Sequence, residues 1–167
     1  MSHTWLTVVE DALGRVDENL TATLDGLDAD ALTHRPGPDA NPIGWLAWHL
    51  TRVLDDHLAA LAGSPQVWEE WRDRFGLPYS RRATGYGQTS AQVGAFRAGA
   101  DDLIGYWTAT WERGREILHD LADDDPERVV DDAWDPPVTL SARLVSLIDE
   151  GAQHVGQMGY VRGLIGA

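Results

Sequence analysis

The sequence predicts an all-α protein: a four-helix bundle with short extra helices in the connections. Apolar residues recur at helical spacing in four long stretches, residues rich in Gly and Pro separate these stretches, and no strand-rich region or internal repeat stands out. At 167 residues the chain has the length of one domain and can bury a sizeable core. We therefore expect a single helical domain over residues 1–167.

The four long helices are expected over residues 6–25, 41–61, 89–121 and 139–165. In the first, apolar residues repeat from Leu6 to Leu24, and the helix should end near Gly26. Asn41 can cap the second helix, and Pro42 suits its first turn because the missing N–H is not needed there.

The later helices and the connections follow from similar signals. Thr89 or Ser90 can cap the third helix, and Thr139 or Ser141 the fourth. A short turn of helix is expected within residues 28–36 and another over 66–75, whereas residues 76–88 read as a loop. The Pro pair at 136–137 favours an extended crossing over residues 129–139.

Composition narrows the classes of function. Hydrophobic residues make up 43% of the chain, which argues against disorder. No apolar run approaches the ~20 residues that span a bilayer, and no signal peptide begins the chain, so we expect a cytoplasmic protein without a membrane partner. The net charge of −14 would repel phosphate backbones, so we expect no nucleic-acid partner.

The last expected helix carries the most informative residues. Glu150 and His154 lie four residues apart within an apolar stripe, so they share one face of the helix. An ionised carboxylate on such a stripe needs a cation, a proton or a metal. His49, in the middle of the second helix, is the best candidate for a third ligand. Two alternatives remain. His49 could be a hydrogen-bonded core histidine, and Glu150 and His154 could form a side-chain pair on a helix surface that contributes about 0.3 kcal/mol.

Several stretches resemble one known family. The motifs are Asn41–Leu50 around His49, Phe75–Pro78, Thr84–Gly87, Trp134–Thr139 and Gln153–Gln157 around His154. Together they look like the DinB-like four-helix bundles, in the branch of mycothiol-dependent maleylpyruvate isomerases and mycothiol transferases. The likeness covers nearly the whole chain. Many members of the superfamily carry His where this chain has Glu150.

The resemblance implies a divalent metal held by His49, Glu150 and His154, with Zn²⁺ expected and Ni²⁺ as the alternative. Because the chain has no cysteine, sulfur chemistry would require a thiol cosubstrate, which the resemblance implies is mycothiol or a related small thiol. A thiol bound to such a metal loses its proton and becomes nucleophilic. The resemblance thus implies a metal-dependent S-transferase acting on a small electrophile, in detoxification.

Two other functions fit the same residues. The metal could activate water in a hydrolase, or it could stabilise a bundle that has no catalytic role. The full isomerases of the branch carry a further C-terminal domain, and this chain ends after the last expected helix, which favours the transferase. The sequence is compatible with a homodimer as well as a monomer.

Other side chains have two interpretations each. Arg81 and Arg82, in the Gly-rich loop, could clamp an anionic substrate or could simply be solvated. We expect the loop over residues 78–88 to line the pocket beside the metal. Gln153 and Gln157 could orient His154. His57 is expected at the surface; the alternative is that it contacts the metal ligands without binding the metal itself. We expect four tryptophans to pack inside the bundle: Trp45, Trp48, Trp107 and Trp111. Three others could line a pocket: Trp68, Trp71 and Trp134. The histidines His3, His34 and His119 are expected to be solvated.

Overall fold

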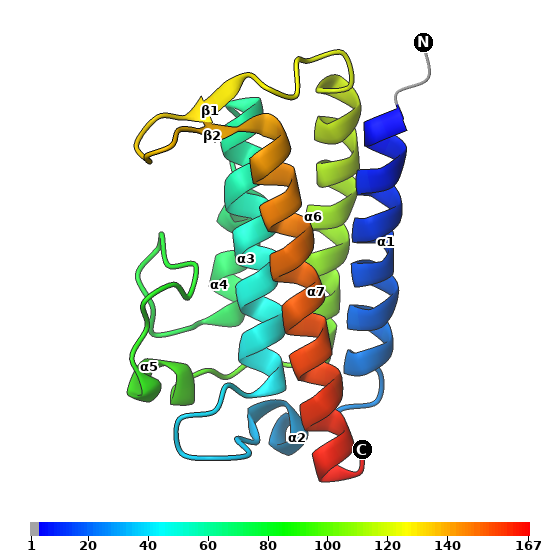
Figure 1. Ribbon diagram of the computed structural model, residues 1–167. Helices are drawn as coiled ribbons and strands as arrows, with labels where there is room; N and C mark the ends of the chain where they lie inside the picture. The colour runs from blue at the N-terminus through cyan, green and yellow to red at the C-terminus, as the bar shows by residue number, and fades with distance from the viewer. Residues whose placement is uncertain (1–3) are drawn as a thin grey trace.

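The computed structural model describes residues 4–167 and confirms the predicted four-helix bundle with short extra helices in the connections (Figure 1). It also contains one small hairpin that the sequence did not predict. His3 lies outside the described residues. The helices are α1 (Thr4–Leu24), α2 (Ala29–Thr33), α3 (Ile43–Ala62), α4 (Trp68–Phe75), α5 (Ser90–Gly94), α6 (Ala100–Asp120) and α7 (Leu140–Ile165), and the strands are β1 (Val129–Asp131) and β2 (Val138–Thr139). None of these helices is both long and apolar enough to cross a membrane.

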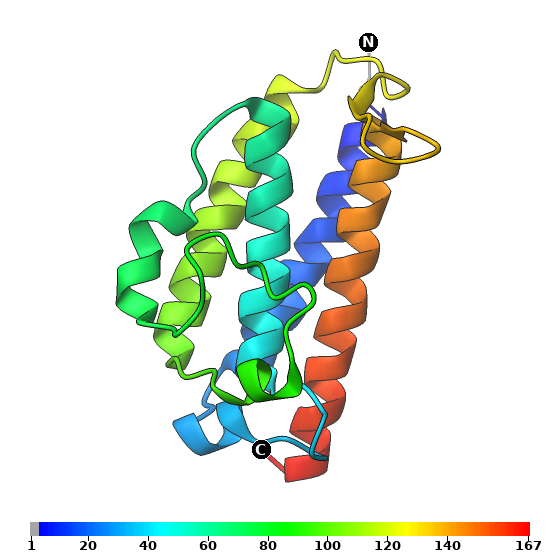
Figure 2. The same cartoon turned by 90° about the vertical axis from the view of Figure 1, so that its left-hand side faces the viewer.

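Four helices, α1, α3, α6 and α7, form the bundle. Both α1 and α3 pack against α6 and α7, so α1 lies diagonally opposite α3 and α6 diagonally opposite α7. Helices α3 and α6 run in the same direction, because in each of them the colour advances along the bar from the bottom of the view to the top (Figures 1 and 2). The chain between them must therefore return along the length of the bundle, and it carries α4 and α5 on the outside.

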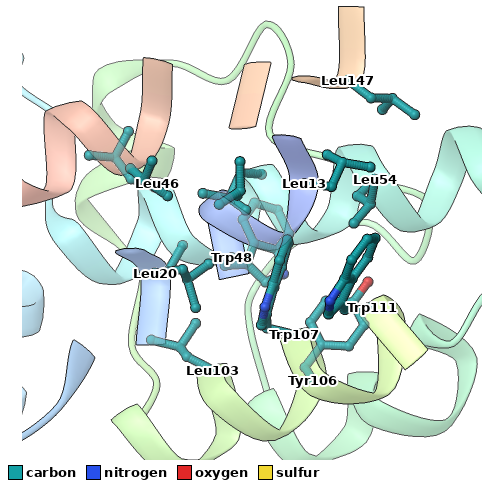
Figure 3. Packing of buried hydrophobic residues seen from close by; sticks show 14 of the residues in the cluster. Leu13, Leu20, Leu46, Trp48, Leu54, Leu103, Tyr106, Trp107, Trp111 and Leu147 are labelled. Carbon is teal, nitrogen blue, oxygen red and sulfur yellow. The ribbon is translucent and has the colours of Figure 1, made fainter. Parts of the chain in front are cut away.

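The core lies where the apolar stripes of the four long helices meet (Figure 3). Leu13 of α1, Leu54 of α3, Trp107 of α6 and Leu147 of α7 are each at most 3% exposed, and all belong to one cluster. Burying a side chain of this size stabilises the fold by roughly 1.5–3 kcal/mol. The expected packing tryptophans Trp45, Trp48, Trp107 and Trp111 are all buried.

Helix α7 forms where the sequence predicts it. The Thr139 side chain accepts a hydrogen bond from the Ala142 amide and so caps the first turn. The helix ends at Gly166, which adopts the left-handed conformation with φ of 71°. Its buried stripe holds Leu140, Leu144, Leu147, Gly151, Val155, Met158 and Val161. Glu150 and His154 lie on the neighbouring face, which turns toward α3.

The prediction of one long helix from Thr89 to Leu121 was wrong. Thr89 and Gln92 form a reciprocal capping box, but the helix that it starts, α5, ends after five residues at Gly94. The bundle helix α6 begins only at Ala100, after Gly99. Two glycines weaken a continuous helix here. The break also allows Phe96 to turn inward, where it is fully buried and 6.2 Å from the Trp48 ring.

Two smaller predictions also need correction. Asn41 does not cap α3, because the N-cap residue is Pro42 and no side-chain hydrogen bond is made there. The segment over residues 129–139 is not a simple crossing: it folds into an antiparallel hairpin in which Val129 pairs with Thr139 and Asp131 with Val138. Backbone hydrogen bonds between two extended segments explain the difference, since strand pairing depends on a partner that local patterns do not specify.

Candidate metal centre

His49 of α3 and the pair Glu150 and His154 of α7 come together across the interface between the two helices. Oε1 of Glu150 lies 3.0 Å from Nε2 of His49 and 3.0 Å from Nε2 of His154. The three candidate ligand atoms all lie within 4.8 Å of one another. The two histidines are 9% and 14% exposed and the glutamate 32%, so the group is sheltered but open on one side.

The outer ring nitrogens define how the two imidazoles are oriented. Nδ1 of His49 lies 2.5 Å from the Thr84 carbonyl oxygen, which can only accept, so this nitrogen carries the proton. Nδ1 of His154 likewise donates to Oε1 of Gln157 at 2.8 Å. Both rings therefore turn Nε2 toward Glu150. This is the arrangement in which protein histidines bind metals.

Three electron pairs that face one another require a cation between them, either protons or a metal ion. Without metal, hydrogen bonds from His154 and His49 lower the pKa of Glu150 well below its usual value. Burial lowers the pKa of His154, but its hydrogen bonds to Glu150 and Gln157 outweigh burial and raise that pKa overall. A divalent ion would take the place of the shared protons. The donor set thus fits a metal such as Zn²⁺, which accepts imidazole and carboxylate ligands.

The returning connection closes the other side of His49. Its ring stacks on Trp45 with centroids 4.7 Å apart, and Trp45 donates to Oε1 of Gln88 at 2.8 Å. Gly85, next to Thr84, packs directly against the His49 ring. His49 is therefore fixed by its own helix and by the loop over residues 84–88.

A cavity of about 800 Å³ opens beside the three ligands. At its far end, Arg143 of α7 pairs with Asp131 of β1 at 2.8 Å, and its Nη1 lies 3.3 Å from Nε2 of His57. Burial and the nearby guanidinium lower the pKa of His57, so this ring is neutral and accepts from Arg143. The rest of the wall comes from Val53, Asp56, Ala60, Leu61, Thr84, Tyr86, Val130, Trp134 and Ser146.

The structure brings some of the predicted site residues to this cavity and leaves others elsewhere. Of the loop over residues 78–88, Thr84 and Tyr86 line it. Arg81 and Arg82 are not among its lining residues, and Arg81 pairs with Glu69 at 2.9 Å. An anion-binding role for these two arginines stays a prediction.

Of the tryptophans and glutamines predicted near the site, only some lie at the cavity or its ligands. Trp134 lines the cavity, whereas Trp68 is buried in the core and Trp71 packs on Tyr106. Gln157 contacts His154, and Gln153 bonds to Asp149 instead.

Sequence reasoning missed Arg143 and Asp131. Arg143 precedes Glu150 by seven residues, so helical spacing alone places both on one face of α7, and this signal was available. Asp131 carried no comparable signal, because its position depends on the hairpin.

The fold and the donor set define a DinB-like helical bundle with a candidate His/Glu/His metal site. Residues 8–167 match the Mycothiol-S-transferase family, and the chain belongs to this family, as its motifs predicted. A crystal structure of a conserved protein from Enterococcus faecalis is similar, with a TM-score of 0.82 and 28% sequence identity over 96% of this chain and 97% of that one. Among curated proteins, none matches this chain.

Proposed function

We propose that the protein is a divalent-metal-dependent S-transferase that joins a small thiol, mycothiol or a close relative, to a small electrophile. The observation that carries the proposal is the convergence of Nε2 of His49, Nε2 of His154 and Oε1 of Glu150 within 4.8 Å beside a cavity. Three protein ligands leave room for a further ligand, as in catalytic rather than structural zinc sites. A metal held there would lower the pKa of a bound thiol, so that sulfur attacks as thiolate near neutral pH.

The residues of the chain would do the rest. With the metal bound, His49 and His154 would coordinate it through Nε2, because Thr84 and Gln157 hold the Nδ1 protons. The carboxylate of Glu150 would neutralise one of the two positive charges of the metal ion. In an addition reaction the sulfur would form a bond to carbon, the π pair would move to the neighbouring atom, and the thiol proton would return to that atom. With an alkyl chloride such as monochlorobimane, the new bond to sulfur would replace the carbon–chlorine bond, chloride would leave, and the thiol proton would pass to solvent.

The size and the lining of the cavity support this proposal. Its volume of about 800 Å³ is in the range of small-molecule sites. Asp56, Ser146 and Arg143 offer hydrogen-bonding groups to a polyhydroxylated thiol such as mycothiol, whereas Trp134 and Tyr86 offer apolar surface to the electrophile. The absence of cysteine agrees with a thiol that arrives from outside.

The test combines metal content with turnover. Protein purified without chelator or a nickel column should hold one divalent ion per chain and conjugate mycothiol to monochlorobimane. His154→Ala should abolish metal binding and conjugation while the helical circular dichroism remains, because the apolar stripe of α7 is unchanged. His119→Ala, which replaces an exposed histidine of α6 outside the group, is the control.

Three results would contradict the proposal. Protein that is isolated without metal and refuses added Zn²⁺ and Ni²⁺ would exclude the metal centre. Hydrolysis of an ester or amide substrate without any thiol would favour the hydrolase. Full metal occupancy with no turnover of any thiol would favour a structural metal in a non-catalytic bundle.

A further inference from the structure

A buried arginine, Arg52, lies on α3 one turn after His49 and does not belong to the candidate ligand group. Its side chain is 0% exposed. A buried guanidinium costs several kcal/mol unless its charge and its N–H groups are compensated. Asp55, which is 4% exposed, supplies the opposite charge, with Oδ2 3.4 Å from Nη1 of Arg52. Asp55 also accepts hydrogen bonds from the amides of Val67 and Trp68 at the start of α4, which accounts for the carboxylate but not for the direction of the arginine.

The end of the guanidinium is held by groups from three parts of the chain. Nη1 also donates to the Tyr106 hydroxyl of α6 at 3.2 Å, and Nη2 donates to Oε1 of Gln66 at 2.9 Å. Tyr106 in turn donates to Asp55 at 2.7 Å, and the Trp68 ring lies under the guanidinium at 5.1 Å. The planar group is therefore locked in one orientation.

The remaining donor points at the loop that contacts the candidate metal ligand. Nε of Arg52 donates to the carbonyl oxygen of Ala83 at 3.1 Å. The next residue, Thr84, accepts from Nδ1 of His49. Two successive carbonyl groups of the loop are thus held from α3, one by each side chain.

The loop has no regular structure of its own, so side-chain hydrogen bonds, including one from Nε1 of Trp68 to the Arg81 carbonyl oxygen, hold it in place. Residues 81–85 belong to neither helix nor strand. A carbonyl group orients a histidine ligand only if its own position is fixed. Losing such a hydrogen-bond partner typically weakens metal affinity about 10- to 100-fold. Arg52 is rigid, always charged and immobilised at its far end, which suits it to this role.

We propose that Arg52 is a positioning residue of the metal centre. By holding the Ala83 carbonyl group, it presents the Thr84 carbonyl group to Nδ1 of His49 and keeps Nε2 as the free ligand atom. The inference rests on the proposed metal centre for its consequence, but the orientation of the His49 proton can be measured without metal.

The test compares Arg52→Lys with Tyr106→Phe. Lysine keeps the charge beside Asp55 but lacks the planar fork that reaches Ala83 and Gln66 together. Tyr106→Phe removes hydrogen bonds from the same buried cluster, but Asp55 still pairs with Nη1 and Nε keeps its contact with Ala83. Long-range proton–nitrogen correlation spectra of the metal-free proteins, in alkaline buffer, report which ring nitrogen of His49 carries the proton. Titration with Co²⁺, followed by its visible absorption, reports affinity and ligand geometry.

We expect Arg52→Lys to populate the Nε2–H form of His49, to bind Co²⁺ about 10- to 100-fold more weakly and to change its visible spectrum. Tyr106→Phe should lose stability yet keep the wild-type tautomer and affinity. Should Arg52→Lys not fold, Gln66→Ala frees one end of the guanidinium and should give the same changes at smaller size.

An unchanged His49 tautomer in a folded Arg52→Lys or Gln66→Ala variant would overturn the inference. So would equal losses of Co²⁺ affinity in Arg52→Lys and Tyr106→Phe, since these would reflect stability alone. A wild-type protein that binds no Co²⁺ would instead overturn the metal centre, and the spectra of the metal-free proteins would still decide the role of Arg52.

Discussion

A Cβ atom on Gly85 would lie 2.6 Å from Nδ1 of His49 and 3.0 Å from the Trp45 ring. The loop can approach the candidate ligand this closely only with glycine at that position. The φ angle of Gly85, +103°, is also one that other residues rarely adopt. Space and backbone conformation therefore both require glycine.

We expect Gly85→Ala to displace either the loop or the His49 ring and to weaken metal affinity about tenfold or more. Backbone strain should also lower the free energy of unfolding by about 1–3 kcal/mol. Calorimetric titration with Zn²⁺ and urea denaturation measure the two effects. Gly87→Ala is the matched control, because Gly87 also has a positive φ, +71°, but a Cβ atom there would meet nothing within 4 Å. Equal loss of metal affinity in both variants would contradict the prediction.

The neutral ring of His57 should make the stability of the metal-free protein depend on pH. Burial and Arg143 lower its pKa below the usual value of 6.5. As the pH falls below 6.5, the unfolded chain takes up a proton more readily than the folded one, so stability is lost on acidification and is fully present above that pH.

Thermal unfolding of wild type and His57→Gln, measured from about pH 8 down to about pH 5, tests this dependence. The wild type should lose more stability than the variant over that range. His34→Gln, which replaces an exposed histidine of a distant connection, should follow the wild type. Parallel profiles of wild type and His57→Gln would show that His57 does not contribute.

Trp134, at the tip of the hairpin, should contribute to binding and not to the metal centre. It is 63% exposed although it lines the cavity, so nothing in the described residues explains it as core packing. Trp134→Ala should raise KM for an aromatic electrophile by about 2- to 10-fold, the equivalent of about 0.5–1.5 kcal/mol of ring contact. Metal content should not change. Tyr160→Ala removes an aromatic residue of α7 that is 69% exposed and does not line the cavity, and its KM should stay at the wild-type value.

The arginines allow a direct comparison of two anion sites. If Arg81 and Arg82 clamp an acidic electrophile, the double alanine variant should lose about 1–3 kcal/mol of transition-state stabilisation with metal content unchanged. If Arg143, which lines the cavity, binds the acidic electrophile instead, then Arg143→Gln should show this loss and the double alanine variant should not. Values of kcat/KM for an acidic electrophile and for its neutral amide distinguish the two. A loss that is equal for both substrates would exclude charge recognition by the arginine concerned.

Local sequence patterns determined much of this protein. The apolar stripes of α1, α3 and α7 were predictable because a helix repeats every 3.6 residues whatever surrounds it. The same periodicity places Glu150 and His154 on one face of α7, and the cap at Thr139 follows from a hydrogen bond within four residues. Motifs around His49 and His154 were enough to indicate the family.

Tertiary structure decided the rest. The break between α5 and α6 depends on the burial of Phe96 against Trp48, and the hairpin on pairing between Val129 and Thr139. Because α3 and α6 run in the same direction, the connection between them returns past His49 and places Thr84 and Gly85 on its ring. These contacts join residues that are far apart in the chain, so their free energies depend on which surfaces the fold brings together and leave no local periodicity in the sequence.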